Sequence, residues 1–342
     1  MSATSATPAD TATPPLPHGR RMVAVIVLIP TLVAVALWAF AWPAARTAPR
    51  DLPLGVAGSV TATAQLEKQL SQHQGAFEIH RYADEAAARD AIEDRTVYGA
   101  VVATAQGPKL LTASAASPVV AQLLQQSVAE QAPAGTKVTT IDVVPASAKD
   151  PRGAALSSSV LPLALVGIAA GAVVTLLGLR GARAVTALVG AAALVGVVAA
   201  ALADSWLGVF TGDWWAEAAA LGLSTLAVGA AVAGLAALFG PAGIGLGGFV
   251  VMLLGNPFSG ASSAPQLLPE PVGTIGQWLP PGAGATLLRS VSFFDGAAAT
   301  GPALTLAWWS VLGLGAVLLG SALKRRGTTT ETAAEREPAL VS

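Results

Sequence analysis

The chain has 342 residues, of which 53% are hydrophobic and only 11% are charged, whereas soluble globular proteins carry about 25% charged residues. Such a chain has too few charged groups to cover a soluble surface, so much of its surface must face lipid. The net charge of −1 argues against a nucleic-acid partner, because no basic stripe is present to neutralise phosphates. The absence of cysteine excludes any disulfide or thiolate chemistry.

The N-terminal segment combines a polar tail with an apolar run. Residues 1–19 are rich in Ala, Thr, Ser and Pro, a composition typical of a disordered tail. Two arginines then precede an apolar run over residues 22–42, which as a helix reaches the roughly 30 Å of a bilayer core. A signal peptide is the alternative, because residues 39–41 resemble a cleavage site, but its apolar region spans only about 7–15 residues. We therefore expect an uncleaved transmembrane helix over residues 20–42.

Residues 43–155 differ in character, because charges of both signs return. Short apolar or β-branched runs alternate there with segments of helical periodicity. Strands are expected at 54–57, 76–79, 98–102, 110–113 and 138–144, and helices at 62–72, 83–92 and 119–129. This alternation predicts one compact α/β domain in which helices cover a sheet.

The remainder of the chain is mostly apolar and predicts a five-helix membrane domain over residues 156–325. Further spans are expected at 158–179, 184–203, 216–239 and 304–323, with a shorter apolar stretch at 243–255. A Pro- and Gly-rich external loop occupies residues 256–302, and residues 326–342 form a polar cytoplasmic tail. The expected fold is therefore an α-helical membrane protein with about six transmembrane helices and one extracytoplasmic α/β domain inserted between the first and second helices.

Basic residues predict the orientation, because cytoplasmic loops carry an excess of Lys and Arg. Three basic groups fall on one side if six segments cross: Arg20/Arg21, Arg180/Arg183 and Lys324/Arg325/Arg326. Arg46 and Arg50 oppose this assignment for the first span alone.

The stretch at 243–255 reaches only about 20 Å as a helix, so it either crosses a thinned bilayer or is re-entrant. If it failed to cross, the basic residues after the last span would lie outside. We therefore expect it to cross, with both termini in the cytoplasm of the cell membrane and residues 43–155 outside.

Motifs for catalysis or cofactor binding are missing from the sequence. It has no G-x-x-x-x-G-K-[ST], H-E-x-x-H or G-x-S-x-G motif, so active transport would take its energy from another protein or an ion gradient. The three histidines, His18, His73 and His80, are expected at the surface and not as metal ligands. We therefore expect no enzyme activity, no catalytic or metal site and no cofactor.

Acidic residues avoid the centres of the spans, which argues against an ion-coupled carrier. Asp204, Asp213 and Glu217 gather beside three tryptophans near an outer interface. We interpret them as solvated acids beside an aromatic belt, with a cation or substrate gate as the alternative.

Glycines recur at helical spacing within the spans. Gly167 and Gly171 form a G-x-x-x-G pattern, and the run from Gly243 to Gly248 matches the dinucleotide fingerprint G-x-G-x-x-G. That fingerprint needs a preceding strand, whereas this run lies in a membrane stretch. Because small residues let helix backbones approach in lipid, we expect Gly167, Gly171, Gly243 and Gly247 at helix-packing contacts, within one chain or between two.

The external loop contains an amphipathic segment. Leu287, Leu288 and Phe294 lie at helical spacing, with Arg289 on the opposite side and Trp278 shortly before them. Such a segment dips into the outer leaflet or packs as a lid on the external domain. We expect these five residues to form an external gate or interface.

Three stretches carry a resemblance to a known family. They are Tyr98-Gly99-Ala100-Val101-Val102, Asn256-Pro257-Phe258-Ser259-Gly260, and Leu279-Pro280-Pro281-Gly282-Ala283 followed by Leu288-Arg289-Ser290. With the predicted layout, they resemble permeases of the type-2 ABC exporter superfamily, nearest the phage-infection-protein (Pip-like) membrane proteins. The resemblance spans residues 20–325. It implies a dimerising permease half, a separate ATP-binding subunit, and short helices that re-enter the outer leaflet.

Two departures from that family concern the coupling to an ATPase. The turn Arg180-Gly181-Ala182-Arg183 stands where such permeases usually have a coupling helix, and residues 1–19 show no amphipathic interfacial helix.

Two functions follow as hypotheses. The first is a permease subunit that moves a lipid or lipophilic compound outward, as a homodimer or a heterodimer with a related permease, powered by a separate ATPase subunit. The second is a membrane-anchored scaffold or surface receptor whose external domain binds a cell-envelope or secretion partner. The short cytoplasmic turns favour the second. In both, the partners are the lipid bilayer and other proteins, without nucleic acid.

Overall fold

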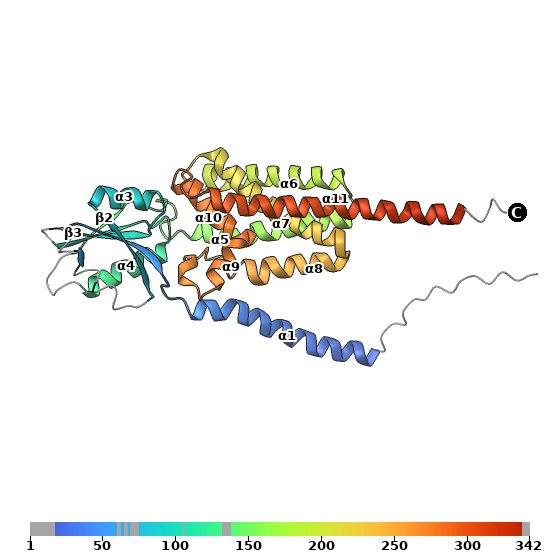
Figure 1. Ribbon diagram of the computed structural model, residues 1–342, viewed down its shortest axis with the longest axis horizontal. Coiled ribbons are helices and arrows are strands. Elements are labelled where there is room, and N and C mark those ends of the chain that lie inside the picture. The colour runs from blue at the N-terminus through green and yellow to red at the C-terminus, as the bar shows by residue number, and fades with distance from the viewer. Residues whose placement is uncertain are drawn as a thin grey trace, which may run out of the picture.

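The computed structural model describes residues 18–59, 63–64, 68, 75–104, 107–131 and 138–336. These residues form a helical bundle with a small mixed sheet at one end (Figure 1). Within them, five helices are long and apolar enough to cross a membrane: Met22–Ala45, Ala154–Leu176, Ala182–Trp206, Trp214–Phe239 and Thr300–Lys324. The described residues are thus mostly helical, with five helices compatible with membrane spans, as the composition predicts. Most of the helix expected at 62–72, and the tail before residue 18, lie outside the described residues.

The sheet has the strand order β2-β1-β3-β4-β5. β3 and β4 pair antiparallel, and the other neighbours pair parallel. The strands are β1 Leu52–Ala57, β2 Phe77–Tyr82, β3 Gly99–Thr104, β4 Gly107–Thr112 and β5 Thr139–Asp142. Each of them overlaps one of the expected strands.

Helices cover both faces of this sheet (Figure 1). α3 (Glu85–Glu93) packs on the face that carries Val102, and α4 (Pro118–Gln131) packs on the face that carries Val101. Adjacent residues of β3 therefore enter different cores, as the two-residue period of a strand requires. Asp84 sets the start of α3, because its side chain accepts a hydrogen bond from the Ala87 backbone N–H at 2.9 Å.

α7 (Trp214–Phe239) is the central helix of the bundle. Of its apolar window 67% is buried, whereas each of the other four candidate spans buries 28% or less. Its packing partners are α5 (Ala154–Leu176), α6 (Ala182–Ala200), α8 (Pro241–Phe249), α10 (Pro280–Phe293) and α11 (Thr300–Arg336). α6 continues as the π-helix η1 (Ala201–Trp206), and α11 continues as a helix past residue 326, where the polar tail was expected to begin.

The four glycines expected at helix-packing contacts all lie against α7. A Cβ atom on Gly167 would stand 2.7 Å from the Cβ of Val228, and one on Gly171 would stand 2.6 Å from the carbonyl oxygen of Gly229. On α8, a Cβ on Gly243 would meet the backbone of Leu235, and one on Gly247 would lie 2.9 Å from Val232 Cγ2. Real Cβ atoms essentially never approach so closely, so a larger residue at these positions would force α7 or the neighbouring helix to shift.

The short apolar stretch begins at Pro241, two residues before the expected start. α8 covers its first part, and the π-helix η2 (Val250–Gly255) covers the rest. Figure 1 shows α8 running back beside the bundle from the end of α7 toward the end that bears the sheet. At 1.5 Å per residue, residues 241–255 extend at most about 22 Å, less than the roughly 30 Å of a bilayer core.

α1 (His18–Ala45) stands apart from the bundle along most of its length (Figure 1). Only 6% of its apolar window is buried. Its last turns are attached, because Trp42 packs against a cluster of Phe258, Leu268 and Val272. α1 therefore meets the rest of the protein mainly at the end that bears the sheet.

We predict that Gly171→Ala destabilises the protein by about 1–3 kcal/mol, because the added methyl group overpacks the contact with α7. Gly190→Ala on α6 is the matched control, since a Cβ there would have nothing within 4 Å. The control should be neutral or slightly stabilising, because alanine is the better helix former. Thermal unfolding in detergent measures both variants. Equal melting temperatures for the two would contradict the packing described.

Candidate functional site

A helical hairpin fills the junction between the sheet and the bundle. α9 (Val272–Trp278) and α10 are separated by Leu279, whose backbone is extended at φ −97° and ψ 148°. Pro280 and Pro281 open α10, where a missing N–H costs nothing because the first helical N–H groups have no partner within the helix. The two prolines explain why the chain breaks here and restarts as a new helix.

α10 joins two hydrophobic cores. Leu287 and Leu288 are 5% and 3% exposed and pack into the cluster at the sheet end of the bundle. Phe294, the residue after α10, packs instead with Ala88 and Ile92 of α3 beneath the sheet. The helix is thus buried on the side that carries its leucines and on the opposite side, where Arg289 is only 6% exposed.

Trp278 is placed differently from the other four residues of the expected gate. Its side chain is 72% exposed, while its backbone carbonyl accepts a hydrogen bond from Trp309 Nε1 at 2.8 Å. The structure therefore gathers Leu287, Leu288, Arg289 and Phe294 in and around one buried helix, with Trp278 at its outer edge.

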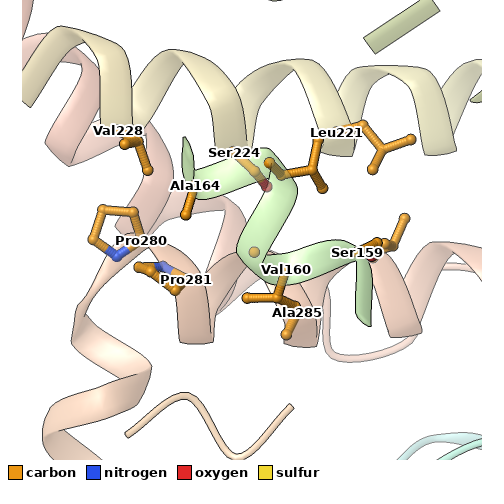
Figure 2. A pocket seen from close by; sticks show the side chains of 12 residues that line it. Ser159, Val160, Ala164, Leu221, Ser224, Val228, Pro280, Pro281 and Ala285 are labelled. Atoms are coloured by element: carbon orange, nitrogen blue, oxygen red, sulfur yellow. The ribbon is translucent and has the colours of Figure 1, made fainter. Parts of the chain in front are cut away.

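Apolar cavities border α10 on the bundle side. Figure 2 shows a narrow pocket where Pro280, Pro281 and Ala285 of α10 face side chains of α5 and α7. Its volume of about 20 Å³ holds little more than one water molecule. The pocket shares Ser159, Leu163 and Leu221 with a larger groove.

This larger groove lies between α5 and α6 and has a volume of about 630 Å³. Its lining contains no charged side chain and only two hydroxyl groups, those of Ser158 and Ser159. A second apolar groove, of about 360 Å³, lies between α7, α8 and α11 and ends at Pro280 and Trp309. Both grooves suit hydrocarbon better than ions.

A polar cavity of about 220 Å³ lies on the other side of α10, against the sheet domain. Arg95, from the turn after α3, donates from Nη1 to the Thr286 carbonyl oxygen at 3.1 Å and to the Ser290 hydroxyl. The Arg95 guanidinium also lies 5.1 Å from the centre of the Phe294 ring. Arg289 donates from Nη2 to the carbonyl oxygen of Ala261 at 3.1 Å.

Tyr98 and two glutamines complete the polar wall of this cavity. Tyr98 Oη donates to Gln266 Oε1 at 2.8 Å. Gln277 is held at both ends, since its Nε2 donates to the Ser259 carbonyl oxygen at 2.9 Å and its Oε1 accepts from Thr286 at 2.7 Å. These bonds fix the glutamine amides without help from a charged partner.

The cavity carries two positive charges. Burial, together with the neighbouring charge of Arg95, lowers the pKa of Arg289 to about 10. Burial also lowers the pKa of Arg95. A pKa of about 10 still leaves Arg289 protonated at neutral pH. Burial raises the pKa of Tyr98, which keeps its hydroxyl protonated.

Sequence reasoning singled out Arg289 but missed Arg95 and the two glutamines. Arg289 stands out as the one charge in an apolar helical segment, whereas Arg95 is one of many charges in the soluble domain. The acids at the sheet end also differ from expectation. Asp213 caps α7 by accepting from the Ala216 N–H at 2.8 Å. Glu217 is fully buried, so its interpretation as a solvated acid was wrong.

Within the described residues, no group of three or more His, Cys, Asp or Glu side chains is placed so that it could hold a metal ion. The chain matches no family model, no curated protein and no solved structure.

We predict that Arg95 and Phe294 are energetically coupled across the junction. In a double-mutant cycle of Arg95→Gln and Phe294→Leu, the coupling energy should be about 0.5–2 kcal/mol, because the guanidinium lies over a desolvated ring. Unfolding in detergent measures the four proteins of the cycle. Arg89→Gln is the control partner, since Arg89 bonds to Glu85 at 3.2 Å and not to the ring. A coupling no larger than that of the control would refute the contact.

Proposed function

We propose that this chain is the permease subunit of an ABC-type exporter that moves a lipid or lipophilic compound outward. The groove between α5 and α6 carries the proposal. Its volume of about 630 Å³ falls within the range of about 300–1,000 Å³ typical of small-molecule sites. An uncharged lining of this kind accepts an apolar molecule from the lipid and offers no carboxylate or imidazole to a metal cation.

The energy for transport comes from a separate ATPase in this proposal. The sequence contains no phosphate-binding loop of its own. Arg180 and Arg183 are exposed and lie in or directly after the turn between α5 and α6. That turn is at the end of the bundle opposite the sheet, where α11 also protrudes (Figure 1). We assign the ATPase contact to this end, and a second permease chain, identical or related, completes the transporter.

The proposed topology follows from the same arrangement. Both the start of α1 and the end of α11 point away from the sheet (Figure 1), which supports cytoplasmic termini and an external sheet domain. Residues 241–255 then count as a sixth, short crossing segment.

A scaffold or surface receptor is the second candidate. One observation favours it: the turn between α5 and α6 spans only residues 177–181 and forms no helix that could transmit the stroke of an ATPase. In that case the sheet domain would bind an envelope or secretion partner, and the spans would only anchor it.

We predict that single introduced cysteines report the proposed topology, because the natural chain has none. Glu93→Cys and Ser262→Cys should react with a membrane-impermeant maleimide in intact cells. Arg183→Cys and Ala242→Cys should react only after permeabilisation. All four positions are exposed. Labelling of Ser262→Cys and Ala242→Cys from the same side would show that residues 241–255 do not cross.

We predict that a candidate ATPase encoded at the neighbouring locus co-purifies with the chain and drives movement of a fluorescent phospholipid analogue in proteoliposomes. Val195→Trp, which places an indole in the groove, should lower that ATP-dependent movement by about tenfold or more. Val189→Trp is the control, since Val189 is on the same helix, 43% exposed and outside the groove. Absence of both the association and the movement would favour the scaffold.

A further inference from the structure

The polar cavity between the sheet domain and α10 contains a charge imbalance. Arg95 and Arg289 both line it, and within the described residues neither takes part in an ion pair, nor does any carboxylate line the cavity. Removing a charge from water costs several kcal/mol unless an opposite charge compensates. Two neighbouring cations without a carboxylate therefore indicate that the missing negative charge belongs to a ligand.

The hydrogen bonds in the cavity occupy only some of the guanidinium N–H donors, while the glutamine side-chain oxygens each already accept one bond. A guanidinium has five N–H donors, and the described residues accept one hydrogen bond from Arg289 and two from Arg95. The side-chain oxygens of Gln266 and Gln277 already accept from Tyr98 and Thr286. The described hydrogen bonds therefore leave N–H donors of both arginines available to an oxygen-bearing anion.

We propose that this cavity binds a phosphoryl group. Two guanidinium groups match its charge of −1 to −2 and its several oxygens, since arginine forms bidentate bonds with phosphate. A carboxylate would offer a single charge and two oxygens, and would leave one arginine uncompensated. The volume of about 220 Å³ admits a phosphate ester but not a whole lipid.

The surroundings make a lipid headgroup the expected source of the phosphate. Trp206, Trp215 and Trp278 are 74%, 71% and 72% exposed, and exposed tryptophans of membrane proteins concentrate at the headgroup level. Gln277 lines the polar cavity and directly precedes Trp278 in the sequence. Pro280, three residues after Gln277, lines the apolar groove beside α11. A phosphate in the cavity would thus lie close to a groove that accepts hydrocarbon.

This site does not depend on the proposed transport. A scaffold could hold a phospholipid here as well as a permease could, and the grooves would keep their shape with the cavity empty. The test therefore measures binding alone, so its failure would leave the transport proposal standing, and failure of transport would leave this site standing.

The test uses the purified full chain in a nonionic detergent, with unfolding followed by the fluorescence of its eight tryptophans. Inorganic phosphate is compared with sodium chloride at equal ionic strength, and short-chain phosphatidylglycerol is compared with diacylglycerol of the same chain length. Phosphate, phosphatidylglycerol or both should raise the melting temperature, because a ligand of the folded state stabilises it. A shift with phosphatidylglycerol alone identifies a headgroup, and one with inorganic phosphate alone identifies a soluble ligand.

Two variants connect the shift to this cavity. Arg289→Gln should weaken phosphoryl binding by about tenfold or more, the loss expected for one charge-assisted contact. Thr96→Glu, at an exposed position on the cavity rim, should do the same by supplying a carboxylate to the arginines, and it leaves their packing untouched. Arg152→Gln is the control, since Arg152 is exposed and outside the cavity, and it should bind as the natural chain does.

Three results would overturn the proposal. They are the absence of a shift with both phosphate-bearing probes, a shift that diacylglycerol or chloride reproduces, and unchanged binding in Thr96→Glu. The last result decides the matter even if Arg289→Gln fails to fold.

Discussion

Contact between helix backbones, with no side chain between them, is the constraint on which the bundle depends. Water cannot drive helices together in lipid, so close van der Waals contact must hold them. α7 meets this requirement on several sides at once. Gly171 of α5 approaches the Gly229 carbonyl, and a Cβ on Gly320 of α11 would lie 2.8 Å from the carbonyl oxygen of Ala237. α7 lies at the centre of the bundle. The grooves lie between the helices around it, where the side chains do not fill the space.

α10 places two chemical environments back to back. Its bundle side meets apolar grooves, and its other side meets the arginine cavity, so one short helix separates hydrocarbon from phosphate chemistry. The proline pair at residues 280–281 makes this separation abrupt. An amphiphile has the same two-part character, which is why the transport proposal and the binding proposal point to related molecules although each stands on its own observations.

Local pattern predicted much of this fold. Strands and spans were predictable because their patterns depend on residues only a few positions apart in the sequence. The packing glycines were predictable because their spacing is that of one helix face. The polar cavity was not predictable, because it depends on the contact between Arg95 and Thr286 of α10, which are 191 residues apart in the sequence. Glu217 was misread because its neighbours include tryptophans typical of an interface, whereas the structure buries it fully, with its carboxylate accepting from the Gly212 N–H at 3.1 Å. The turn that carries Gly212 packs on α10, where the Thr211 hydroxyl donates to the Ser292 carbonyl oxygen at 3.2 Å, and that contact across 81 residues leaves no local pattern.

The attachment of α1 at one end has a mechanical consequence. The Ala48 N–H donates to the Leu267 carbonyl and the Arg50 N–H to that of Gln266, both at 3.0 Å, while the Gln266 side chain forms part of the cavity wall. α1 is thus attached at one end, beside the cavity, and this attached end would be the pivot of any rotation of the helix. Its 28 residues extend about 42 Å, so a rotation of about 10° at the pivot would sweep the far end through about 7 Å. A rearrangement at Gln266 would therefore be amplified into a larger displacement of the far end of α1.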